Sequence, residues 1–172
     1  MSEPIKVMIV DDHTLFRQGL RKVLETYEEI QVIGEASDGK EVVAKVAELH
    51  PDVVLMDIRM RWMDGFDATR LIRESYPELL IIALTMYEDA EYVLKMVHSG
   101  ANAYMYKDVS ADKLVDTIKH MREGIMPLFY LAVEAETLRE VVPARMRRNE
   151  LSSQERHILK LMAEGNSNKE IA

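Results

Sequence analysis

Cysteine is absent from this chain of 172 residues. Its absence excludes a disulfide framework and any metal site built from thiolates. The sequence also lacks an apolar run close to the ~20 residues that a membrane-spanning helix needs. Its first residues contain no basic segment followed by an apolar stretch and a cleavage site, so we predict no secretory signal. We therefore expect a cytoplasmic protein without a membrane partner.

The composition is that of a globular protein whose charge is unevenly distributed. Apolar residues make up 48% of the chain and charged residues 30%, with a net charge of −8. Residues 140–172 contain six basic and five acidic residues, a net charge of +1, which leaves 16 basic and 25 acidic residues, or −9, in residues 1–139. An acidic body repels nucleic acid, so contact with DNA would require a separate module in the tail.

Two periodicities alternate along the first ~123 residues. Short apolar runs, rich in β-branched residues, predict strands, and apolar positions at helical spacing between them predict amphipathic helices. The predicted strands are 5–10, 30–35, 53–56, 79–84 and 103–106, and the predicted helices are 16–27, 38–49, 64–75, 90–97 and 114–121. Strands that are apolar on both faces indicate burial on both sides. The sequence therefore predicts an α/β fold with a five-stranded, doubly wound parallel sheet.

Acidic residues follow two of the predicted strands. Asp11 and Asp12 come directly after the first strand and Asp57 after the third. The carboxyl ends of parallel strands share one edge of the sheet, where such folds bind ligands. Three converging carboxylates would repel one another and raise one another's pKa. A hard divalent cation such as Mg²⁺, which prefers oxygen ligands, would relieve this repulsion.

Two more strand ends carry groups that suit a transferred phosphoryl group. Thr85 ends the fourth strand with a hydroxyl, and Lys107 follows the fifth with a cation. Taken singly, a strand-end Asp is usually a helix cap, Thr85 and Lys107 are ordinary surface residues, and Tyr104 is ordinary core. Together, the strand-end residues indicate charge neutralisation around a carboxylate nucleophile that forms an aspartyl phosphate.

The motifs that carry these residues resemble a known family. They are VDDH at 10–13, MDIRM at 56–60, MDG at 63–65, LT at 84–85 and GANAYMYKD at 100–108. Residues 5–123 thus resemble the receiver domain of two-component response regulators, which has a flavodoxin/CheY-like fold. The resemblance implies that Asp57 is the phospho-acceptor. It also implies that Asp12, Asp57 and the backbone carbonyl of Arg59 bind Mg²⁺ directly, with Asp11 acting mostly through water.

The resemblance also assigns the remaining strand-end residues. Thr85 would follow the phosphoryl group inward, Tyr104 would change rotamer with it, and Lys107 would pair with the phosphoryl oxygens. One departure concerns the loop after Asp57, where Arg61 and Trp62 replace the usual proline-containing sequence. Arg61 does not fix φ as proline does, so we expect a looser loop. Trp62 would either cover the mouth of the site or contact a partner.

The tail contains two capping boxes, Ser152 with Glu155 and Ser167 with Glu170, separated by a glycine. Two capped helices joined by a short turn are typical of a helix-turn-helix. The segment LSSQERHILKLMAEGNSNKEIA resembles the start of a LuxR-type DNA-binding domain, as in the NarL/FixJ group. The chain stops at Ala172, before the helix that would read bases, so DNA-contacting residues stay unassigned. We predict a receiver domain over 1–124, a linker over 125–149 and a truncated, all-α helix-turn-helix domain over 150–172.

Three functions compete. The first is a transcriptional response regulator that accepts a phosphoryl group from a sensor histidine kinase, forms a phosphorylation-dependent homodimer and, in its full-length form, binds DNA. The alternative is a receiver that only docks protein partners. The third is a phosphohydrolase, but such enzymes place a second acid close after the nucleophile, and residue 59 is Arg. We therefore expect no enzyme that turns over a substrate.

Overall fold

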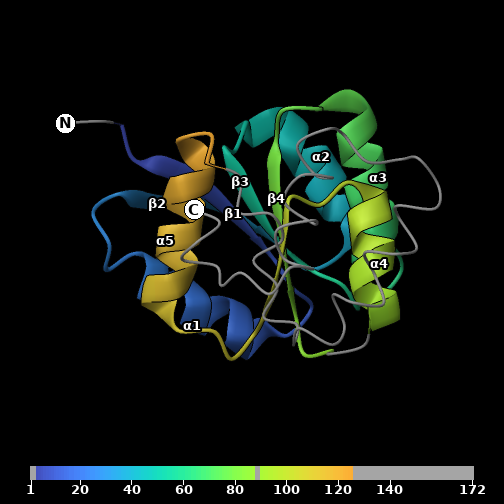
Figure 1. Cartoon of the computed structure of the whole chain (residues 1–172), viewed down its shortest axis with the longest axis horizontal. Coiled ribbons are helices and arrows are strands. Elements are labelled where there is room, and N and C mark those ends of the chain that lie inside the picture. The colour runs from blue at the N-terminus through green and yellow to red at the C-terminus, as the bar shows by residue number, and fades with distance from the viewer. Residues whose placement is uncertain (1–2, 88–89, 126–172) are drawn as a thin grey trace, which may run out of the picture.

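The computed structural model describes residues 3–87 and 90–125 of the chain. Five strands and five helices alternate along these residues and form a three-layer α/β/α arrangement (Figure 1). The predicted linker beyond residue 125 and the predicted helix-turn-helix over 150–172 lie outside the described residues. None of the helices in the described part is long and apolar enough to cross a membrane.

The five strands form one parallel sheet in the order β2-β1-β3-β4-β5. Their bounds are β1 (Ile5–Val10), β2 (Ile30–Ala36), β3 (Val53–Asp57), β4 (Leu80–Thr85) and β5 (Ala103–Tyr106). Every residue of β3 and β4 is buried, as expected for central strands covered on both faces. At one edge, the pairing of β1 with β2 shifts register between Val7 and Met8; at the other, β5 has only four residues. The predicted sheet is confirmed.

The helices cover the sheet in two layers, with α1 and α5 on one face and α2, α3 and α4 on the other (Figure 1). Their bounds are α1 (Thr14–Leu24), α2 (Gly39–Leu49), α3 (Gly65–Ser75), α4 (Ala90–Ser99) and α5 (Ala111–Arg122). Alternate residues of β1 point to opposite layers, since Met8 joins the core under α2–α4 and Ile9 the core under α1 and α5. The first helix begins at Thr14 and ends at Leu24, earlier at both ends than the predicted 16–27, and the Tyr27 N–H then bonds to the Leu24 carbonyl in a closing turn.

The strand order places the ends of β1 and β3 side by side at the centre of the sheet. The chain crosses from β1 to β2 in one direction and then returns to build β3, β4 and β5 on the other side. Val10 pairs with Met56, so the residues that follow them, Asp11 and Asp57, lie at the same edge. This reversal of direction is where doubly wound sheets form their ligand crevice.

The start of α2 is fixed by a network of side-chain caps. The carboxylate of Asp38 accepts hydrogen bonds from the backbone N–H groups of Lys40 and Glu41, at 2.8 and 3.0 Å. The carboxylate of Glu41 accepts from the backbone N–H of Ser37 at 2.7 Å and pairs with Lys45 at 2.6 Å. These interactions, led by the bond from Lys45, lower the pKa of Glu41 to about 2.

We predict that Glu41→Gln destabilises the fold at neutral pH. Because the side chain of Glu41 is 35% exposed, solvent screening limits the loss to about 0.5–1 kcal/mol. A depressed carboxyl pKa contributes stability above the unfolded-state pKa and loses it as the pH falls through the folded-state value. Urea unfolding at pH 7 and pH 3 should therefore show a smaller difference between variant and wild type at pH 3, which lies between the two pKa values. Glu48→Gln, at the other end of α2, is the control, and an equal loss at both pH values would contradict the prediction.

The start of α3 is pinned against the end of β3. The backbone N–H of Gly65 donates to the Ile58 carbonyl at 2.9 Å. A Cβ on Gly65 would lie 2.2 Å from the carbonyl oxygen of Asp57, a distance that no side chain can occupy. Glycine at this position therefore lets the helix approach the backbone that carries Asp57.

We predict that Gly65→Ala costs about 1–3 kcal/mol, because the backbone must shift to accept the methyl group. Gly19→Ala is a matched control: Gly19 lies inside α1, and a Cβ there would meet nothing within 4 Å. That control should be neutral or stabilise the fold by up to about 1 kcal/mol, since alanine is the better helix residue. Urea unfolding of both variants measures the difference, and equal stabilities would refute the close-approach argument.

Candidate functional site

The predicted site residues lie together at the carboxyl edge of the sheet. Asp11 follows β1, Asp57 ends β3, Thr85 ends β4 and Lys107 follows β5. Backbone hydrogen bonds hold two of these positions: the N–H of Asp11 donates to the Ala36 carbonyl at 3.0 Å, and the N–H of Lys107 donates to the Thr85 carbonyl at 2.8 Å. The fold thus brings four strand ends to one place.

Lys107 joins the two buried carboxylates. Its Nζ lies 2.7 Å from Asp11 Oδ2 and 3.0 Å from Asp57 Oδ2. The three side chains are between 2 and 6% exposed, so all three charges are removed from water. The ammonium also lies 4.8 Å from the ring centroid of Phe16 on α1, a cation–π contact that adds to its attraction. Buried charges are tolerated only when paired in this way.

One ammonium does not neutralise this pocket. Burial first, and the nearby Asp11 carboxylate second, raise the pKa of Asp57 to about 6 against the opposing effects of Lys107 and the Ile58 N–H. The raised pKa means that the ionised form of Asp57 is less favourable here than in water. An additional positive charge would stabilise the ionised carboxylate.

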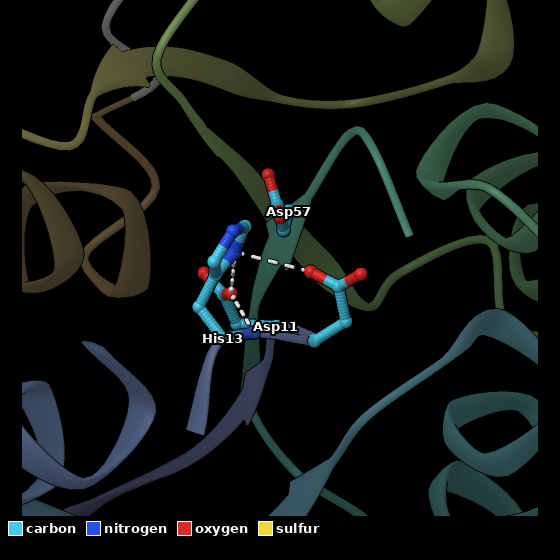
Figure 2. Close-up of side chains that lie close together, drawn as sticks. Asp11, His13 and Asp57 are labelled. Atoms are coloured by element: carbon cyan, nitrogen blue, oxygen red, sulfur yellow. Dashed lines mark hydrogen bonds and ion pairs between the residues drawn. The ribbon is translucent and has the colours of Figure 1, made fainter. Parts of the chain in front are cut away.

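Asp12 and His13 complete the acidic cluster. The His13 Nδ1 lies 3.1 Å from an oxygen of Asp11 and 3.1 Å from an oxygen of Asp12, and Figure 2 shows this ring beside Asp11, with Asp57 close to both. Ligand atoms of these four residues lie within 4.8 Å of one another. Asp12 was predicted here. His13 was not, although its place directly after the two acids in VDDH was the available signal.

The oxygen atoms of this cluster fit a divalent cation. Among the described residues, neither Asp11 Oδ2 nor Asp12 Oδ1 receives a well-aligned hydrogen bond, although Lys107 and His13 lie near them. Carboxylate oxygens with unused lone pairs, in a pocket short of positive charge, are the donors that Mg²⁺ prefers. The acidic pocket is therefore consistent with divalent metal binding.

A second ion pair, which the sequence analysis missed, supports the backbone of Asp11. The Arg17 guanidinium donates to the Asp11 carbonyl through Nη1 and to Glu35 through Nε, the latter at 2.8 Å. Arg21 lies 3.3 Å from the same Glu35 carboxylate. Arg17 and Glu35 are 18 residues apart, and no local pattern indicates that they meet. The ion pair links α1 to β2 next to the backbone of Asp11.

The two predicted switch residues meet at Tyr87, in the segment after β4. The backbone N–H of Tyr87 donates to Thr85 Oγ1 at 3.1 Å, and its carbonyl accepts from the Tyr104 hydroxyl at 2.8 Å. Thr85 and Tyr104 are both fully buried. The structure therefore links these residues through one backbone unit, a connection that the sequence did not indicate.

The loop after Asp57 adopts a turn that the sequence did not predict. The Met63 N–H donates to the Arg61 carbonyl at 2.8 Å, and Trp62 between them has a φ of +68°. A residue other than glycine rarely adopts this left-handed backbone conformation, which costs of order 1–3 kcal/mol. The Trp62 side chain is 88% exposed, so it does not lie against the carboxylates in this structure. Its contact with a partner stays a prediction, as does the cation-binding role of the Arg59 carbonyl.

Known proteins match most of this chain. Residues 7–119 match the family described as response regulator receiver domain, and residues 149–172 match the bacterial regulatory proteins of the luxR family. The chain is 37% identical to the response regulator protein VraR of Staphylococcus epidermidis, over 98% of this chain and 80% of that protein.

Solved structures agree with this assignment. The signal receiver domain of the response regulator NarL from Mycobacterium tuberculosis has a TM-score of 0.68 and 28% identity, covering 72% of this chain and 99% of its own. A CheX–CheY–BeF₃–Mg²⁺ complex from Borrelia burgdorferi has a TM-score of 0.64 and 25% identity, covering 70% and 90%. With the parallel sheet and the acidic pocket described above, these matches show that the chain is a two-component response regulator of the NarL/FixJ group, in which a receiver domain is joined to a LuxR-type DNA-binding domain.

Proposed function

We propose that the Asp57 carboxylate accepts a phosphoryl group from a sensor histidine kinase in a Mg²⁺-dependent reaction. The observation that carries this proposal is the buried pair of Asp57 with Lys107, 3.0 Å apart, inside a cluster of acids at the carboxyl edge of the sheet. A buried carboxylate with a cation held against it is arranged to attack an electrophile and to neutralise the charge that the product carries.

The proposed reaction uses the side chains already described. An oxygen of Asp57 forms a bond to phosphorus while the bond from phosphorus to the donor's histidine nitrogen breaks, and that nitrogen keeps the electron pair. The Lys107 ammonium, which contacts two carboxylates before transfer, would pair with the phosphoryl oxygens after it. Mg²⁺ would add the charge neutralisation that one ammonium cannot provide, held by Asp12, Asp57 and the Arg59 carbonyl, with Asp11 acting mostly through water.

The proposed output passes through the switch residues. Thr85 would donate its hydroxyl to the phosphoryl group and Tyr104 would follow, which biases the surface formed by α4, β5 and α5. We propose a receiver domain over 1–124, a linker over 125–149 and a LuxR-type helix-turn-helix domain over 150–172. Phosphorylation would then control homodimerisation and DNA binding, and the LuxR-family match over 149–172 favours this output over a receiver that only docks proteins.

Incubation with acetyl phosphate and Mg²⁺ tests the chemistry directly. Intact mass should show a gain of one phosphoryl group on the wild type, because the small donor needs no kinase. Asp57→Asn should show no gain, since the amide is a poor nucleophile, and chelation of the metal should abolish the gain in the wild type. A wild type that stays unmodified would indicate a receiver that works without phosphorylation.

A thermal unfolding series tests the cation site separately from phosphoryl transfer. Mg²⁺ should raise the unfolding temperature of the wild type, because a ligand that binds only the folded state stabilises it. Asp12→Asn should lose most of this shift. Asp67→Asn, an exposed acid on α3 outside the cluster, should keep it in full. Equal shifts in all three proteins would mean that the cation binds elsewhere.

A further inference from the structure

An aromatic stack lies beside the proposed acceptor site and connects three elements. The rings of Tyr87, after β4, and Tyr92, on α4, are stacked, with centroids 5.0 Å apart and planes 9° apart. The Arg59 guanidinium, two residues after Asp57, lies 5.8 Å from the Tyr87 ring centroid, and its Nη1 lies 3.0 Å from the Tyr92 hydroxyl. Arg59 thus holds both tyrosines, one by a cation–π contact and one by a hydrogen bond.

The stack continues to the start of α3. The Tyr92 ring lies 5.9 Å from the ring of Phe66 at a tilt of 34°, and the Lys95 ammonium lies 4.1 Å from the Phe66 ring centroid. Phe66 follows Gly65, the residue pinned against the Asp57 carbonyl. Both ends of the stack are therefore attached to the segment that carries the proposed acceptor.

The backbone of Tyr87 is the point where this stack meets the proposed switch. Its N–H donates to Thr85 and its carbonyl accepts from Tyr104. These contacts connect the two sides of the site. Arg59, two residues after Asp57, contacts Tyr87 and Tyr92, and Tyr87 in turn bonds to Thr85 at the edge of the sheet. Tyr87 therefore combines in one residue the ring that Arg59 and Tyr92 contact and the backbone groups that bond to both switch side chains.

We propose that Arg59 and Tyr92 are positioning residues that hold Tyr87, and through it Thr85 and Tyr104, in the arrangement that receives the phosphoryl group. This inference rests on the proposed function. The unphosphorylated protein already has the Tyr104 hydroxyl bonded to the Tyr87 carbonyl and its ring fully buried. The contacts of Arg59 and Tyr92 with Tyr87 therefore pre-organise the switch residues before any group is transferred. Pre-organisation of this kind raises the affinity of the protein for the phosphoryl group, although Arg59 and Tyr92 do not contact that group.

The test is the affinity of the full chain for beryllium trifluoride, a phosphoryl analogue, measured by calorimetric titration in saturating Mg²⁺. Tyr92→Phe removes the hydroxyl but keeps the ring stack, and Arg59→Met removes the guanidinium but keeps the backbone carbonyl. Each should weaken analogue binding about three- to tenfold, the effect of losing one partly exposed hydrogen bond. The double variant should bind no more weakly than the worse single variant, because both act through the same contact.

Two controls separate positioning from general damage. Tyr27→Phe deletes another tyrosine hydroxyl, one that donates to Asp112 at 2.7 Å on the opposite face of the sheet, and should bind the analogue as the wild type does. Tyr92→Phe should bind Mg²⁺ alone with wild-type affinity, which a merely structural defect would not preserve.

The outcomes distinguish the two proposals. If the wild type fails to bind the analogue, the proposed phospho-acceptor function itself is wrong, and the positioning roles are wrong with it. If the wild type binds it and Tyr92→Phe and Arg59→Met bind equally well, only the positioning roles are overturned. Parallel losses of Mg²⁺ and analogue affinity in Tyr92→Phe would also overturn them, because the variant would then have lost the site rather than its alignment.

Discussion

The pairing of one buried ammonium with two buried carboxylates is the interaction on which the arrangement of the site depends. Lys107 reaches Asp11 and Asp57 only because β1, β3 and β5 end at one edge of the sheet. Three charges with almost no exposure are costly unless each has a partner. The strand order brings the partners together, and the Phe16 ring lies 4.8 Å from the Lys107 ammonium. The same pocket remains short of positive charge, and that shortage makes it receptive to a cation.

The sheet and its helices could be predicted because their signals are local. Runs such as Val53–Met56 and Leu79–Leu84 are too short and too uniformly apolar for anything but buried strands, and each of them became a strand buried on both faces. The convergence of Asp11, Asp57, Thr85 and Lys107 followed from one topological rule, that parallel strands end at a common edge. The residue types suggested charge neutralisation around a carboxylate nucleophile, and the family resemblance implied the individual role of each residue.

The rest of the site could not be predicted because its contacts join residues without periodic spacing. Arg17 meets Glu35 across 18 residues and Arg59 meets Tyr92 across 33, and either arginine could equally have been a solvated surface side chain. The left-handed turn at Trp62 was also hidden, since a bulky aromatic gives no sign of a positive φ. The backbone closes a hydrogen bond across Trp62, and the looser loop expected from the loss of proline stays a prediction.

The two margins of the sheet have a consequence for how this protein behaves at high concentration. A strand at the margin exposes unpaired N–H and C=O groups and can recruit a strand from another molecule. Here β5 offers only four residues, and β2 carries a register irregularity with its partner and the polar side chains of Gln31 and Glu35. Short or irregular margins of this kind are poor templates for intermolecular pairing. Within residues 3–87 and 90–125, self-association through sheet extension is therefore disfavoured.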